Sequence, residues 1–453
     1  MSRASISRTG GMIPRLTLAS NFRWSFVGNL VHAGCQWGMV AVLARLGTAE
    51  EVGKMVLGAA ITAPIMALTM LQLRNVQATD AREQYHFADY LGLRMVTTVI
   101  AMALIAVSAA TSDISVSTFW VVLIVGMTKS SDGLNDLVRG LFQQEERMDF
   151  AGISLALRGA GGLLSMILAY LASGSIVVAL SAAMIVRFLM NAAYDAPYAS
   201  RLLSQKYRAS TQGESNDWSL LTPRFTTRVM LGLTWTALPL GIVMALVSLQ
   251  TSLPRYALSG YGGEKELGIF GLLAYPLVAG TMVTGALGQS ASPRLAKYFL
   301  NDRAAYCRLL GKMALISLGL GLASILVAAA LGRPVLTLIY GAEYADYQKE
   351  FVIIAVAGAV QLIASPFGYA MTAARAFRMQ AVIVTFSCLA TAAASLWLVP
   401  ERGIAGASIA VVVTGACMLA GFAAGVAIQL RRPVAHVPSE NQTADQKDAT
   451  RVD

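Results

Sequence analysis

Long apolar stretches recur along almost the whole chain and limit what it can fold into. Only 13% of the 453 residues are charged, against about 25% in a soluble domain. A helix needs about 20 apolar residues to cross the hydrocarbon core of a bilayer, so the sequence predicts an all-α integral membrane protein. We expect about twelve spans, at residues 24–44, 55–72, 91–110, 116–139, 151–172, 175–194, 229–250, 267–288, 311–331, 351–371, 381–399 and 406–430.

The distribution of Lys and Arg sets the expected orientation of these spans. With the N-terminus in the cytoplasm, the outward loops hold only seven basic residues: Arg45, Lys54, Arg255, Lys265, Arg333, Lys349 and Arg402. Cytoplasmic loops of membrane proteins carry an excess of Lys and Arg. The sequence therefore predicts that both termini are cytoplasmic, and the net charge of +10 does not require a nucleic-acid partner.

The chain divides into two sets of six expected spans. We expect a cytoplasmic N-terminal tail at 1–22, an N-lobe at 23–195, a cytoplasmic linker at 196–227, a C-lobe at 228–430 and a disordered cytoplasmic tail at 431–453. Residues 43–54 share their order of Arg, Gly and acidic residues with 253–268, and 145–153 resembles 376–384. These matches favour a parallel internal repeat, as in transporters whose site lies between two halves.

A charged stripe in the span 116–139 is the main candidate site. Lys129, Asp132, Asp136 and Arg139 fall within about 80° of one another on a helix, and Asn135 lies among them. Each charge costs about 2.5–3.5 kcal/mol at mid-bilayer, so the stripe faces protein or water. Two interpretations remain open: a water-filled interior, or a neutral strut formed by the pairs Lys129–Asp132 and Asp136–Arg139. Coupling of a proton or a sodium ion to Asp132 or Asp136 is a further hypothesis.

A second polar stripe lies on the span 24–44. Ser25, Asn29, His32 and Gln36 fall within about 60° of helical arc. They either form hydrogen bonds between packed helices or line the same interior as the charged stripe. The same two alternatives hold for scattered polar residues of later spans: Asn191, Tyr194, Gln250, Tyr275, Gln289, Gln361 and Tyr369.

Several classes of chemistry have no signal in the sequence. The four cysteines show no CxxC spacing and are interpreted as packing residues rather than metal ligands. No GxxxxGK[ST] loop occurs, so we expect neither nucleotide hydrolysis nor a cofactor.

The loop sequences carry a resemblance to a known family. They are LQLRNVQATD at 71–80, FADYLGLR at 87–94, GLFQQEERMD at 140–149, PRY at 254–256, ASPRLAK at 291–297, YGAEYAD at 340–346 and TAARAFRMQ at 372–380. In this order they resemble the polysaccharide-transporter branch of the MOP flippase superfamily, which includes the Wzx-type O-antigen flippases. The resemblance implies two V-arranged six-helix lobes in a bacterial inner membrane. It also implies that undecaprenyl-pyrophosphate-linked oligosaccharide crosses between leaflets by alternating access.

The resemblance and the charges together define the expected site. A pyrophosphate requires cations, for which the candidates are Lys129, Arg139, Arg158, Arg228 and Arg255. The residues expected to line the cavity or couple an ion are Asn29, His32, Gln36, Asp132, Asn135, Asp136 and Gln361. Arg158 alternatively extends its charge to the inner interface. The arginines that lipid II flippases carry inside their first two helices are missing here, since Arg74 only closes the second span.

Two other classes of membrane protein, an antiporter and an enzyme, fit the sequence less well. A MATE-type cation or drug antiporter favours a net acidic interior, whereas here Lys129, Arg139 and Arg158 offset Asp132 and Asp136. A membrane enzyme such as an O-antigen polymerase or ligase needs a long outer loop, and the outer loops here are short. We therefore expect a flippase rather than an enzyme. Its partners are the lipid-linked oligosaccharide, the membrane, and the glycosyltransferases and polymerase of the same pathway.

Overall fold

The computed structural model is built of helices. It describes residues 16–79, 84–210 and 219–431, and in these ranges it contains no β-strand. The first group of helices is α1 (Leu18–Leu46), α2 (Ala49–Thr69), α3 (Leu73–Thr79), α4 (Phe87–Thr111), α5 (Val116–Gln144), α6 (Met148–Ser173), α7 (Ile176–Met190), the π-helical turn η1 (Asn191–Asp195) and α8 (Ala196–Ser210). The second is η2 (Ser219–Leu221), α9 (Thr227–Asn301), α10 (Arg303–Ile339), η3 (Ala342–Tyr347), α11 (Gln348–Ala373) and α12 (Phe377–Arg431).

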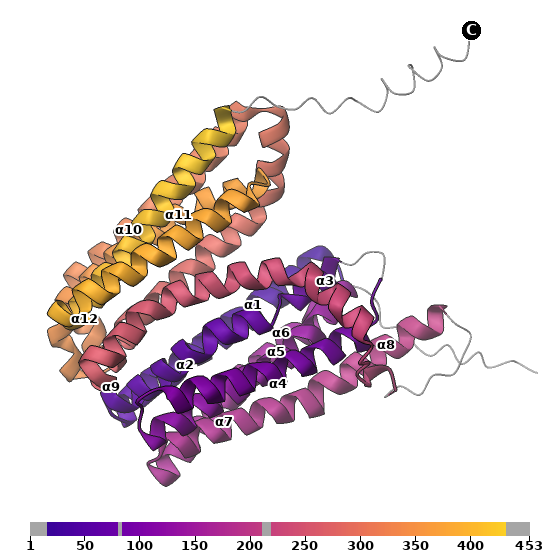
Figure 1. The fold of residues 1–453 in the computed structure, drawn as a ribbon, viewed down its shortest axis with the longest axis horizontal. Coiled ribbons are helices and arrows are strands. Elements are labelled where there is room, and N and C mark those ends of the chain that lie inside the picture. The colour runs from indigo at the N-terminus through magenta and orange to yellow at the C-terminus, as the bar shows by residue number, and fades with distance from the viewer. Residues whose placement is uncertain (1–15, 80–83, 211–218, 432–453) are drawn as a thin grey trace, which may run out of the picture.

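Helices α9 and α12 each consist of two segments that meet at a glycine. Gly263 has φ 74° and Gly403 has φ 51°, a backbone conformation that L side chains rarely adopt. At both positions the chain reverses its direction (Figure 1). In the described part of the chain, nine helices are long and apolar enough to cross a membrane. Two of these contain the breaks, and α5, with its charged stripe, is a further spanning helix. The segments then number twelve, so the predicted all-α fold and its span count are confirmed.

The two expected tails and the expected linker fall partly outside the described residues, the linker at 211–218. Most of the predicted N-terminal tail and almost all of the C-terminal tail lie at 1–15 and 432–453. The expected linker 196–227 contains helix α8, which continues α7 through the π-helical turn η1.

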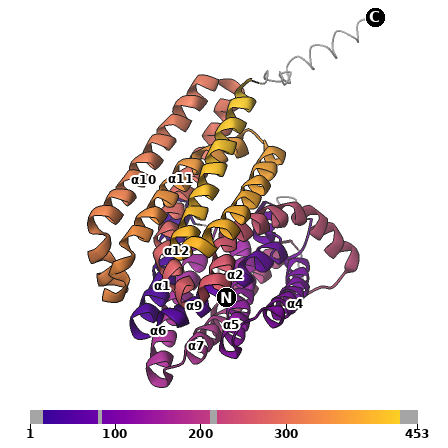
Figure 2. The same ribbon diagram turned by 60° about the vertical axis from the view of Figure 1, so that its left-hand side comes forward.

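The helices form two groups that meet at one end and separate toward the other (Figures 1 and 2). We call the first end, which carries Gly47, Gly263 and Gly403, the converging end. The other, which carries the turns at 145–147 and 374–376, is the diverging end. The first segment of α9, residues 227–262, packs along α2 of the first group: the Tyr256 hydroxyl donates to the Ala60 carbonyl, and Gly241 lies against Leu68 and Leu71.

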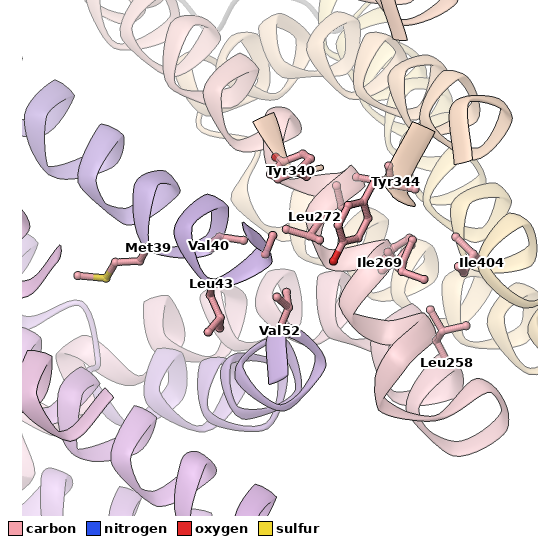
Figure 3. Packing of buried hydrophobic residues seen from close by; sticks show 14 of the residues in the cluster. Met39, Val40, Leu43, Val52, Leu258, Ile269, Leu272, Tyr340, Tyr344 and Ile404 are labelled. Atoms are coloured by element: carbon pink, nitrogen blue, oxygen red, sulfur yellow. The ribbon is translucent and has the colours of Figure 1, made fainter. Parts of the chain in front are cut away.

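A hydrophobic core joins the two groups at the converging end. Leu43 and Val52 of the first group pack with Leu258 and Leu272 of α9, next to Tyr340 at the end of α10 (Figure 3). Arg45 adds polar contacts, donating to the carbonyl oxygens of Leu338 and of Ile339 at 2.9 Å. The other clusters lie within one group or between the first group and α9, one of them including Leu267 just after the break at Gly263. Apart from the first segment of α9, which packs along α2, the two groups are therefore held together at the converging end.

Glycines allow the closest approach of the two groups. A Cβ atom added to Gly53 would overlap the Glu264 carbonyl, and one added to Gly268 would overlap the Ala49 carbonyl. Along the chain, Gly53 and Gly268 have the same separation as Ala49 and Glu264, so the contact is reciprocal. We call these four residues the glycine seam. Small residues of this kind let helix backbones approach each other in membranes.

Two pairs of turns give the internal repeat a structural form. Glu146 and Arg375 both have φ 56°, and Gly174 and Gly403 both have positive φ. The separation along the chain is the same for both pairs. The repeat therefore relates α5, α6 and α7 to α11 and the two segments of α12. The separation along the chain given by these turns is two residues shorter than the separation that the sequence match of 145–153 with 376–384 indicates.

Candidate substrate-binding site

The charged stripe of α5 is directed toward other helices of the first group. The Asp132 carboxylate accepts from Arg158 Nη2 of α6 at 3.0 Å and from Arg187 Nη1 of α7 at 3.0 and 3.2 Å. The Asp136 carboxylate pairs with Arg74 of α3 at 3.5 Å. Neither of the pairs Lys129–Asp132 and Asp136–Arg139 occurs among the ion pairs of the described residues. The acidic residues of the stripe therefore find their partners on other helices.

Arg158 is completely enclosed by protein. Its side chain is 1% exposed, and it donates to Asp132, to Asn191 at 2.6 Å, to Ser131 at 3.1 Å and to Asp195 at 3.4 Å. A buried guanidinium is tolerated when its charge is paired and its donors are satisfied. In this conformation Arg158 holds α5, α6 and α7 together.

The π-helical turn η1 completes this arrangement. Asn191 and Asp195, at its two ends, both reach Arg158, and π-helical turns often mark functional positions in helices. Asn135 donates to Asp195 at 2.8 Å and to Ser154 at 2.9 Å. We call Asp132, Arg158, Arg187, Asn191 and Asp195 the Arg158 network.

The stripe itself is half-buried. The side chains of Asp132 and Asp136 are 25% and 29% exposed. On one side of the stripe lies His32 of α1, whose ring is influenced by the charge of Asp132. On the other side lies Arg74, which follows α2. The stripe is thus partly exposed and partly packed against other helices.

Comparisons with known proteins agree with this architecture. No protein-family model matches the chain. The capsular polysaccharide biosynthesis protein CapF of Staphylococcus aureus is 25% identical over 402 residues, covering 88% of this chain and 96% of CapF. The solved structure of the lipid II flippase MurJ in an inward closed conformation matches with a TM-score of 0.65 at 11% identity, covering 90% of this chain and 87% of MurJ. An inward-facing multidrug resistance MATE transporter of the MOP superfamily matches with a TM-score of 0.60 at 12% identity, covering 94% of this chain and 98% of that one.

The chain has the fold of these two transporters, which we call the MOP fold. This likeness of fold agrees with the resemblance that the loop sequences carry. The Arg158 network lies inside the first helix group.

The α1 stripe has a divided environment in this MOP fold. His32 lies against α6, with its Nδ1 3.3 Å from the Leu155 carbonyl, and Gln36 is 3.4 Å from the other nitrogen of the His32 ring. Asn29 is exposed and donates to the Ser25 carbonyl of its own helix at 2.7 Å. His32 thus contacts α6, Gln36 contacts His32 of its own helix, and Asn29 is exposed.

The remaining predicted residues lie away from the α5 stripe. Arg228 is exposed at the start of α9. Arg255 is further along the same segment, and its buried Nε has no hydrogen-bond partner in the described residues. Gln361 of α11 packs against Gly415 of α12 in the second half. Within the described ranges, none of the three forms a hydrogen bond or ion pair with the stripe.

The second half of the MOP fold replaces the charges with neutral groups. By the repeat, Gln361 corresponds to Asp132 and Ser387 to Arg158. Ser387 accepts from Gln250 Nε2 at 2.8 Å and donates to the Thr414 carbonyl at 3.2 Å. The predicted spans 351–371, 381–399 and 406–430 contain no charged residue. The charged chemistry is thus a property of the first half.

Arg94, Arg187 and Asp195 belong to the charged region but are not among the site residues predicted from the sequence. Arg94 and Arg187 lie within the predicted spans 91–110 and 175–194, as do Lys129 and Arg158 within theirs. Asp195 follows the second of these spans directly. A charge inside an apolar span is itself a signal of function, so Arg94 and Arg187 were visible in the sequence. What was not visible is which acid each one faces.

Proposed function

We propose that this transporter is a flippase for an anionic lipid-linked oligosaccharide, the undecaprenyl-pyrophosphate-linked repeat unit of a surface polysaccharide. The observation that carries the proposal is the charge around the α5 stripe. Among the described residues its cations outnumber its acids: Arg74, Arg94, Lys129, Arg139, Arg158 and Arg187 lie around Asp132, Asp136 and Asp195. An interior with excess positive charge in a low-dielectric surrounding favours an anion.

The division of polarity between the halves fits a substrate with two unlike parts. Phosphates need cations, which the first half supplies. A hydrated glycan needs neutral hydrogen-bonding groups and space, which the polar but uncharged second half and the separated helix groups are suited to provide. Within this proposal Lys129 and Arg139 contact the phosphates, while Arg158 is a positioning residue that orients α5.

The relatives support the same class of substrate. CapF is named for capsular polysaccharide biosynthesis, and MurJ is named as a lipid II flippase. A MATE-type cation or drug antiporter is the second candidate, because a MATE transporter shares the fold. The excess of cations near α5 weighs against it. Translocation makes and breaks no covalent bond, so the function that we propose is that of a transporter and not of an enzyme.

The proposed orientation follows from the basic residues. Arg147, Arg201 and Arg224 lie at the diverging end, and the positive-inside tendency places this end in the cytoplasm of a bacterial inner membrane. A lipid-linked saccharide made by cytoplasmic glycosyltransferases then meets the open side of the molecule. A headgroup with two negative charges gains about 4–5 kcal/mol per 100 mV when it leaves a negative-inside cell.

Reconstituted transport tests the proposal. Proteoliposomes with a fluorescent undecaprenyl-pyrophosphate oligosaccharide should show protein-dependent loss of protection from a membrane-impermeant glycosidase. Lys129→Gln should lower the rate, because it removes a half-buried cation that has no ion pair in the described residues. Arg308→Gln, at an exposed position of the second half, is the matched control. Export of ethidium against a proton or sodium gradient, without movement of the oligosaccharide, would reject the flippase in favour of the antiporter.

A further inference from the structure

Arg94 of α4 is a buried cation that has no ion pair with a carboxylate among the described residues. Its side chain is 2% exposed, and its Nε and Nη2 have no hydrogen-bond partner in the described residues. It faces α5 at Gly133, where a Cβ atom would lie 3.7 Å from its Cδ and 3.9 Å from its Nη1. An unpaired buried charge is strongly destabilising. Its retention here indicates that another anion completes the site.

Two further guanidinium groups, those of Arg74 and Arg139, lie near Asp136. Arg74 pairs with Asp136 at 3.5 Å and donates to Gln143 at 3.0 Å. Arg139 has a buried Nε with no partner in the described residues, and the charges of both Arg74 and Asp136 act on it. Along α5, Asp136 lies about one turn from Gly133, which Arg94 faces, and about one turn from Arg139. We call Arg74, Arg94, Arg139 and Asp136 the arginine cluster; it carries three positive charges and one negative charge.

We propose that the arginine cluster binds the diphosphate of the transported lipid, and that Asp136 holds part of this site until the diphosphate arrives. The proposal rests on the proposed function and adds the location and valence of headgroup binding. A diphosphate diester carries two negative charges, which match the two uncompensated positive charges of the cluster. Guanidinium groups bind phosphate through two parallel hydrogen bonds, so three of them can hold two phosphates.

Access to the cluster is from the exposed edge of the stripe. Arg74 and Asp136 are 23% and 29% exposed, while Arg94 lies behind them. An incoming diphosphate first meets Arg74 and displaces Asp136 from it, after which Arg94 and Arg139 complete the binding. A monoanionic phosphodiester would leave one cation unpaired. The cluster therefore selects diphosphate over monophosphate lipids.

Binding of soluble probes to the purified full-length protein tests this site. UDP-glucose is a diphosphate diester with two charges, and dimethyl phosphate is a phosphodiester with one; uridine controls for the nucleoside. At constant ionic strength, calorimetric titration should give an affinity for UDP-glucose at least about tenfold above that for dimethyl phosphate, the change expected from one further charge-assisted contact. Equal affinities, or binding of uridine as tight as that of UDP-glucose, would overturn the proposal.

Three variants separate binding from folding. Arg94→Gln should weaken UDP-glucose binding by about tenfold or more, and Arg308→Gln should leave it unchanged. Asp136→Asn should tighten it, because the internal competitor is removed. In the absence of ligand, Arg94→Gln should keep or raise the unfolding temperature, since it removes an unpaired buried charge. An Arg94→Gln variant that unfolds more easily, or Asp136→Asn binding more weakly, would show a structural role instead.

The site and the proposed function fail separately. Selective binding of UDP-glucose without transport of the lipid-linked oligosaccharide would reject the flippase and keep the diphosphate site. Transport at the normal rate by Arg94→Gln would reject the site and keep the flippase.

Discussion

At the scale of single residues, charges of similar appearance in the sequence have different environments. Arg158 and Lys129 both lie in predicted spans, yet Arg158 is surrounded by protein acceptors and Lys129 is half-buried without an ion pair in the described ranges. Asp195, also buried, has a second carboxylate oxygen that finds no donor among the described residues. The Arg158 network is therefore balanced closely, and each of its members depends on the others.

Removing Arg158 should unfold the first half rather than weaken substrate binding. Arg158→Gln leaves Asp132 and Asp195 with one cation, Arg187, which contacts only Asp132, and breaking such a buried pair costs about 3–5 kcal/mol. Thermal unfolding of the purified protein should show the loss. Lys129→Gln, the control, should unfold close to the wild-type temperature.

A double variant separates charge balance from ligand contact. Arg158→Gln with Asp195→Asn restores neutrality and should recover much of the folded protein, as measured by monodisperse yield. If the double variant unfolds as easily as Arg158→Gln alone, the charge pair is not what Arg158 contributes to stability.

At the scale of elements, the π-helical turn η1 sets the direction of two network residues. A π-helical turn contains one residue more than the α-helical turn it replaces. In η1 this places Asn191 and Asp195 around the same guanidinium group. The sequence NAAYD carries no recognised signal for such a turn, so periodicity predicts only a continuous helix through this region.

Deletion of Ala193 should disrupt the network as a point substitution there would not. Removing one residue converts the turn toward an α-helix and rotates Asp195 by about 100° relative to α7. We expect lower thermal stability, similar to that of Arg158→Gln. Ala193→Ser, at an exposed position of the same turn, should be neutral in the same unfolding measurement. Wild-type stability of the deletion variant would show that the turn is not required.

At the scale of the whole molecule, the glycine seam determines how closely the two helix groups meet. In the proposed transport by alternating access, the converging end has to open. A side chain at Gly53 or Gly268 would prevent the reciprocal contact that closes it here. Thr118 and Lys54 add side-chain contacts to Glu264 across the same region. These contacts are local and polar, in contrast to the core in Figure 3.

A bulky side chain in the seam should shift the protein toward opening at the converging end. Gly53→Leu places a side chain where the Glu264 carbonyl lies, so the groups have to separate. Spin labels at Leu46 and Leu338 occupy exposed positions on the two groups. Double electron–electron resonance should report a longer distance between the two labels. Gly260→Leu is the control, because nothing lies within 4 Å of a Cβ atom there. An unchanged distance in Gly53→Leu would contradict the role of the seam.

Residue patterns predicted the class of fold well and the site only in part. The twelve spans follow from hydropathy, because a bilayer imposes one length on every crossing helix. The stripe at Lys129, Asp132, Asp136 and Arg139 was found because helical periodicity is local. Its partners Arg74, Arg94 and Arg187 come from three other helices, and a single sequence does not specify which helices pack together.

The sequence by itself determined that the chain is a helical membrane protein with charges that require burial or water. The uneven distribution of Lys and Arg between the two sets of loops also predicts the orientation in the membrane. Only the tertiary structure shows that Arg158 is paired with acidic residues of the protein itself. It also shows that Arg94 has no paired carboxylate among the described residues. The reason is physical: hydropathy acts along the chain, residue by residue, whereas the pairing of charges depends on distances between helices that are far apart in sequence.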